Sequence, residues 1–192
     1  IVIYPFGGIA KFNMPLNTSI IKEIIILIMG PVFQVLAYFI LLKIMPDQIE
    51  SIKLYHYSIL IFNLLPVYPL DGGKLVNLFF SLKFSFKNSF YLEILISYLM
   101  VFLLVIVNRE NININLLIIV IFLLYKITKE YKQIELFYNK FLLERYINKY
   151  NFKHSIIINN INKFNRNKRH FLKTSNKYYL EAEILKKIYK NR

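Results

Sequence analysis

The chain has 192 residues, a formal net charge of +14 and a composition that is 56% hydrophobic and 17% aromatic. This composition is too apolar, and too clearly divided into apolar segments, for an ordinary soluble domain. Cysteine is absent, which excludes disulfides and thiolate ligands within these residues, so a metal site here must use His, Asp or Glu.

Four apolar segments predict membrane-spanning helices: residues 24–42, 54–82, 90–107 and 114–127. The first has 19 uncharged residues, close to the roughly 20 that a helix needs to cross a bilayer. Lys and Arg favour alternate loops, as the positive-inside rule expects. The sequence therefore predicts an all-α, multi-pass membrane protein, with both ends of this chain in the cytoplasm.

The second segment is interrupted between residues 63 and 75. Pro66 and Pro69 cannot continue a regular helix, and Gly72 and Gly73 permit a close approach of the backbone to a neighbour. Asp71 lies between them, and a carboxylate at membrane depth is costly enough to suggest a function. We expect a broken helix with Asp71 at the break, acting either as a metal ligand or acid-base group, or as the cap of a short helix over residues 72–82.

Two further polar features leave alternatives open. Asn63, one turn before Pro66, either satisfies backbone groups freed by the prolines or binds a substrate carbonyl. Residues 126–192 contain 17 Lys or Arg against 5 Asp or Glu. This part is either attracted to anionic lipid or an acidic protein, or is a solvated extension. Nucleic-acid binding is not expected, because no recognition module surrounds the charge.

The chain is accordingly divided into a membrane core, residues 1–127, and a basic, partly helical cytoplasmic tail, residues 128–192. We expect an amphipathic helix over residues 128–150, an Asn- and Lys-rich stretch over residues 151–177, and a short helix over residues 178–189.

The pattern Asn63-x-x-Pro66-x-x-Pro69-x-Asp71-Gly72-Gly73 resembles the signature of the site-2 protease family of intramembrane zinc metalloproteases, in its sporulation stage IV branch. Three more segments, 4–8, 29–31 and 141–146, resemble that branch in the same order. The resemblance implies that Asp71 is a ligand of Zn²⁺ and that Asn63 helps to hold substrate. The prolines and the two glycines match structural positions of the motif.

The family's other zinc ligands lie in a His-Glu-x-x-His helix, which these 192 residues lack. The resemblance implies that this helix precedes residue 1, in a parent protein with six spans, and that the fragment alone is inactive. The implied activity is regulated intramembrane proteolysis of a membrane-tethered protein, such as a pro-sigma factor during sporulation. The implied partners are this substrate, the lipid bilayer and regulatory membrane proteins, and the implied location is a bacterial cell membrane. The alternative is an inactive membrane scaffold or a transporter-like protein.

Overall fold

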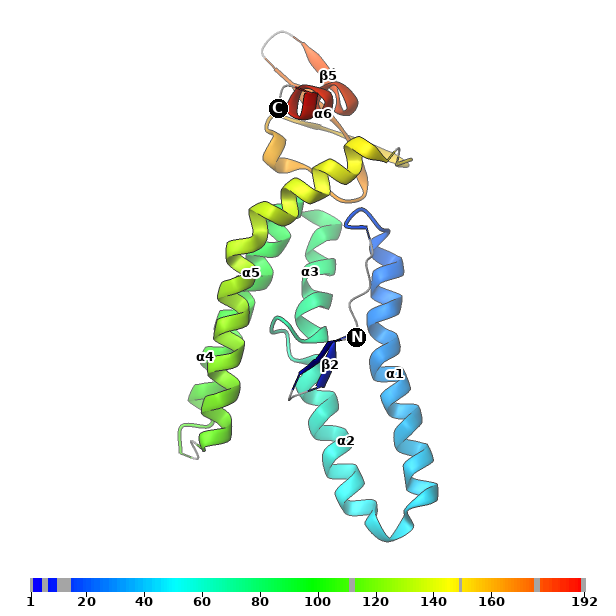
Figure 1. Ribbon diagram of the computed structural model, residues 1–192, viewed down its shortest axis with the longest axis vertical. Coiled ribbons are helices and arrows are strands. Elements are labelled where there is room, and N and C mark those ends of the chain that lie inside the picture. The colour runs from blue at the N-terminus through cyan, green and yellow to red at the C-terminus, as the bar shows by residue number, and fades with distance from the viewer. Residues whose placement is uncertain are drawn as a thin grey trace.

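The computed structural model describes residues 2–4, 7–9, 15–110, 113–148, 150–174 and 177–190. Figure 1 shows long helices and, at one end of them, a small unit of strands and a helix. In chain order the elements are β1 (Val2–Tyr4), β2 (Gly7–Ile9), α1 (Ile20–Ile44), a 3₁₀ turn (Pro46–Gln48), α2 (Ile49–Leu64), α3 (Asp71–Lys83), α4 (Phe86–Val107), α5 (Ile114–Ile147), β3 (His154–Ile158), a second 3₁₀ turn (Ile161–Lys163), β4 (Lys168–Lys173), β5 (Tyr178–Leu180) and α6 (Glu181–Lys190).

β1 and β2 form an antiparallel hairpin in which Tyr4 pairs with Gly7. Tyr4, Gly7 and Gly8 of the segment that resembles the protease family lie in these strands. Pro5 and Phe6 of the same segment lie outside the described residues.

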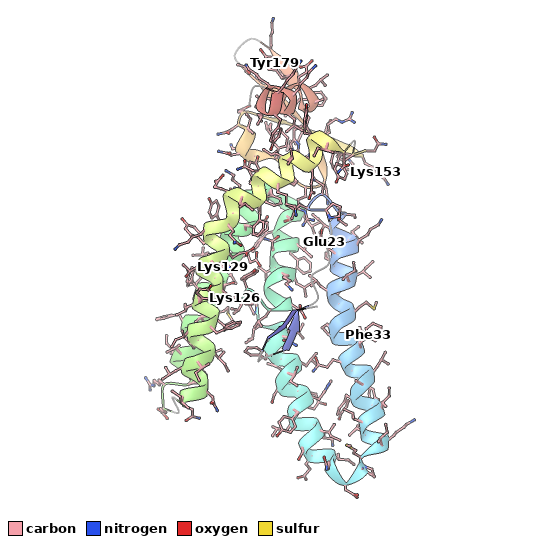
Figure 2. The ribbon with its side chains drawn as sticks, viewed as in Figure 1. Glu23, Phe33, Lys126, Lys129, Lys153 and Tyr179 are labelled. Carbon is pink, nitrogen blue, oxygen red and sulfur yellow. The ribbon has the colours of Figure 1, made fainter. Side chains whose placement is uncertain are left out.

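Among the described helices, α1 and α4 are long and apolar enough to cross a membrane. They contain the predicted spans 24–42 and 90–107, and each begins four residues earlier than expected. Apolar side chains cover the outside of α1; Phe33, for example, is 65% exposed and projects away from the other helices (Figure 2). Exposed apolar surface on this scale suits lipid rather than water, so the protein is membrane-associated.

The other two predicted spans take a different form. Residues 54–82 are divided between α2 and α3, whose 16 and 13 residues are each short of the roughly 20 that a span needs. Residues 114–127 form only the first part of α5, which continues without a break to Ile147. The total of four spans and the cytoplasmic position of both ends therefore stay predictions.

The unbroken course of α5 joins the two parts into which the sequence was divided. Its buried side chains recur every three or four residues from Val120 to Arg145, so one face of the helix is covered throughout. The predicted boundary between residues 127 and 128 falls inside this helix. α5 packs along α4, and α3 lies between that pair and the hairpin of α1 and α2 (Figure 1).

The all-α prediction is wrong for residues 154–180, which form a three-stranded sheet in the order β3-β4-β5. β3 and β4 are parallel, whereas β4 and β5 are antiparallel. The apolar residues of this Asn- and Lys-rich stretch are spaced for a small core rather than for a helix. Ile158, Phe164 and Leu185 are buried with Phe86 and Phe141 from the long helices. We call β3, β4, β5 and α6, with their connections, the cap. The predicted helix over residues 178–189 corresponds to β5 followed by α6.

Arg145 of α5 is the main link between the cap and the helices. Its side chain is 1% exposed, and all five of its N–H donors have acceptors. Nε donates to Asn17 Oδ1 at 2.7 Å, and Nη1 donates to Glu181 Oε1 at 2.9 Å. The remaining donors are bound by three backbone carbonyls of the cap, those of Asn165, Arg166 and Lys168.

Two further contacts attach the cap to the helix ends. Arg166 pairs with Glu23 in the first turn of α1, at the end of that helix nearest the cap (Figure 2). The Phe86 N–H, at the start of α4, donates to the Phe164 carbonyl at 2.8 Å. The cap therefore holds the start of α1, the start of α4 and the end of α5 together.

Candidate functional site

The predicted break in the second apolar segment is confirmed. α2 ends at Leu64 and α3 begins at Asp71, with Pro66 and Pro69 in the turn between them. Two short backbone hydrogen bonds, from Val67 N–H to the Leu65 carbonyl at 2.7 Å and from Leu70 N–H to the Val67 carbonyl at 2.8 Å, close this turn. Because proline has no N–H and clashes with the preceding helical turn, the backbone leaves the helix here.

Gly72 and Gly73 are necessary for the first turn of α3 to pack against this connection. A Cβ on Gly72 would lie 2.2 Å from the Leu64 carbonyl oxygen, and one on Gly73 would lie 2.5 Å from the Val67 carbonyl carbon. Both distances are far below van der Waals contact. The expected close approach is therefore present, and the neighbour is the turn that precedes the glycines.

Asp71 is the first residue of α3, and Leu70 occupies the capping position. The Asp71 side chain makes no hydrogen bond to the described residues, so the alternative that it caps the helix is not supported. Its Oδ1 lies 3.7 Å from Lys74 Nζ, and its Oδ2 lies 3.7 Å from the place of a Cβ on Gly30. The carboxylate thus faces the glycine of α1, and its side chain is 33% exposed.

Asn63 lies in the last turn of α2 and is half-buried. Within the described part of the chain, its side-chain amide makes no hydrogen bond. It therefore does not satisfy the backbone groups freed by the prolines, which was the structural alternative to a role in substrate binding. The binding role itself stays a prediction.

The described residues do not hold a metal ion by themselves. No group of three His, Cys, Asp or Glu among them is placed to coordinate one. His56 packs instead against Tyr38, with ring centroids 4.2 Å apart. Asp71 offers a carboxylate of the kind that zinc accepts, with Oδ1 in an ion pair with Lys74, but a zinc ion there needs further ligands from outside these residues.

A row of buried polar side chains behind Asp71 was not singled out from the sequence. Ser89, Glu93 and Ser97 of α4 are spaced four residues apart and are at most 2% exposed. The four-residue spacing of these polar residues on an apolar helix is the signal in the sequence that points to a buried polar face. Facing them are Asn77 and Ser81 of α3.

A cavity of about 310 Å³ adjoins this polar row. Its lining includes Tyr68 and Lys74 from the broken segment, Asn77 and Glu93 from the row, and Glu130 of α5. Glu130 is buried and lies near Tyr68. The helix break is therefore surrounded by polar groups from α3, α4 and α5, an arrangement typical of irregular backbone that lines a wet interior in membrane proteins.

Fold and site define a membrane-associated, mostly helical protein with a carboxylate at an interrupted apolar helix. No family model matches the chain. It is 30% identical over 157 residues to Stage IV sporulation protein FB of Bacillus subtilis (strain 168), and the match covers 78% of this chain and 54% of that protein. The chain thus spans about half the length of this curated relative. The two proteins are distantly related, in agreement with the resemblance of the motifs to the stage IV sporulation branch.

Proposed function

We propose that the protein containing this chain is an intramembrane zinc metalloendopeptidase and that Asp71 is one of its zinc ligands. The observation that carries the proposal is the Asp71 carboxylate, which lies at the start of α3, free of hydrogen bonds to the described residues and opposite a glycine. Such a carboxylate is open to a metal on the side of Gly30. The distant relationship to a sporulation protein and the family-like motif support the same conclusion.

The roles of the residues follow from their positions around the break. Zinc, when bound, lowers the pKa of its water toward about 7, so that hydroxide is available for peptide hydrolysis. Asp71 would hold the metal together with a His-Glu-x-x-His segment outside these 192 residues. Asn63, with its free amide one turn before the break, would bind a substrate carbonyl. The substrate is a membrane-tethered protein whose helix must unwind before its backbone becomes accessible, and a pro-sigma factor fits the sporulation relationship.

The test is the substitution Asp71→Asn in the complete protein, with Asp47→Asn, an exposed carboxylate in the turn after α1, as the matched control. We expect Asp71→Asn to lower zinc content and cleavage of a membrane-tethered substrate by at least the 10- to 100-fold that the loss of outer-shell partners costs. Asp47→Asn should retain both. Unchanged zinc content in Asp71→Asn would refute the ligand role.

The alternative of an inactive scaffold or transporter-like protein is favoured by one observation: among the described residues, no three His, Cys, Asp or Glu are grouped so as to hold a metal ion. It predicts that no His-Glu-x-x-His is encoded upstream of Ile1 in the same reading frame. Sequencing that region separates the two functions: if the motif is present, the scaffold interpretation loses its support.

A further inference from the structure

Two polar contacts link α3 to α4, and a third links the turn before α3 to the next helical turn of α4. Ser81 Oγ donates to Ser89 Oγ at 3.0 Å, and Asn77 Nδ2 donates to Glu93 Oε2 at 2.8 Å. We call these contacts, together with the third described below, the polar ladder. Such hydrogen bonds between helices replace water as the partner of polar groups in an apolar environment.

The third contact of the polar ladder reaches the turn that precedes Asp71. The Tyr68 N–H donates to Ser97 Oγ at 2.9 Å, and Ser97 Oγ donates in turn to the Glu93 carbonyl at 2.8 Å. The side chain of Tyr68 lies near Glu130 of α5, and both residues line the cavity. Tyr68 is therefore held through its backbone N–H, three residues before Asp71.

The geometry fixes the position of α3 along α4. If α3 moved by one helical turn, Asn77 would separate from Glu93, which is 2% exposed, and Ser81 would separate from Ser89. None of the residues of the polar ladder makes a hydrogen bond to the Asp71 carboxylate. The effect of the ladder on Asp71 is exerted through the turn of residues 68–71, which the glycines keep in close contact with the start of α3.

We propose that Ser97 is a positioning residue for Asp71: through the backbone N–H of Tyr68 it holds the broken segment so that the Asp71 carboxylate faces Gly30. The claim that Ser97 positions Asp71 does not depend on the proposed function. The claim that this position affects peptide cleavage rests on the proposed protease function. Loss of Ser97 Oγ should let the turn shift and misdirect the carboxylate without removing any group that touches substrate.

The first experiment measures placement without activity. Because the chain lacks cysteine, the double variant Gly30→Cys, Asp71→Cys provides one pair of thiols, and copper-catalysed disulfide formation in membranes reports their proximity. We expect Ser97→Ala to slow cross-linking at least fivefold, Ser97→Thr to restore it, and Ser58→Ala, an exposed serine of α2, to leave it unchanged. Equal cross-linking rates in Ser97→Ala and the parent would overturn the proposal.

The second experiment measures cleavage by the complete protein with Asp71 intact. We expect Ser97→Ala to lower kcat about tenfold with KM nearly unchanged, and Ser97→Thr to recover the rate; a purely structural serine would change only the amount of folded protein. If Ser97→Ala does not fold, Ser97→Val, which has the shape of the rescuing threonine but lacks the acceptor oxygen, takes its place in both experiments. Absence of cleavage in every form, with cross-linking altered as expected, would refute the protease function and leave the positioning role standing.

Discussion

At the scale of single residues, the first turn of α3 depends on the absence of two side chains. Gly72 and Gly73 are buried against the backbone of the turn that contains Pro66, whereas Gly30 of α1 has room beside Asp71. The three glycines therefore respond differently to the addition of one methyl group. This difference makes the close approach at the break measurable.

We predict that Gly72→Ala destabilises the protein by about 1 to 3 kcal/mol or more, because its Cβ would overlap a backbone carbonyl that cannot move freely. The matched control is Gly30→Ala, whose Cβ would make an ordinary contact at 3.7 Å. In the interior of a helix this change should be neutral or stabilising by up to about 1 kcal/mol. Thermal unfolding in detergent measures both, and equal melting temperatures for the two variants would contradict the close packing.

At the scale of elements, β4 and α6 are joined around His170, which is fully buried. Its Nε2 accepts the Asn165 N–H at 2.9 Å, so the proton of the neutral ring lies on Nδ1 and points to Glu181 Oε2 at 3.1 Å. Burial lowers the pKa of His170, an effect that outweighs the hydrogen bond to Glu181. Burial raises the pKa of Glu181, whereas the hydrogen bond from His170 and the charge of Arg145 lower it. The lowering effects are larger, so the net shift of the pKa is downward.

Both shifts predict a cap that loses stability as the pH falls. His170 stays neutral in the folded state, while the unfolded chain takes up a proton below its ordinary pKa of about 6.5. The free energy of unfolding should therefore decrease from about pH 6.5 downward, and Glu181 adds a further decrease at still lower pH. Melting temperatures between pH 7.5 and 5.5 test this. His170→Gln should flatten the dependence, and His154→Gln, at an exposed position of β3, should leave it unchanged.

At the scale of the whole molecule, the cap joins segments that are far apart in the chain. Asn17, at the start of the described helical part, donates through Nδ2 to the Phe141 carbonyl at 3.0 Å. Arg166 of the cap reaches Glu23 and the Thr18 carbonyl. Since α1 carries Gly30, which faces Asp71, the cap also helps to define the position of the helix opposite the candidate site.

We predict that Arg166→Met loosens the start of α1 by leaving Glu23 without its partner. Hydrogen exchange at residues 20–24 should become at least about tenfold faster, which corresponds to about 1.4 kcal/mol in the opening free energy. Arg169→Met, at an exposed position of β4, should leave exchange in α1 unchanged. Unaltered exchange at residues 20–24 in Arg166→Met would show that the cap does not restrain this helix.

The broken segment shows how much of the site could be predicted. Pro66, Pro69 and the two glycines act through their own backbone chemistry, so the interruption, and the position of Asp71 at the start of a helix, could be predicted from local sequence. The polar ladder could not, because the partners of Glu93 and Ser97 lie on another element. Only the four-residue spacing of Ser89, Glu93 and Ser97 pointed to a polar helix face.

The cap is the part of the fold that could not be predicted from the sequence. The sequence by itself determined where apolar segments begin and end, since hydropathy and the conformational limits of proline and glycine are properties of neighbouring residues. Only the tertiary structure decided that Arg145 of α5 links the helices to a folded cap and that Asp71 faces Gly30. The acceptors of Arg145 range from Asn17 to Glu181, and pairings over such distances depend on how the helices pack.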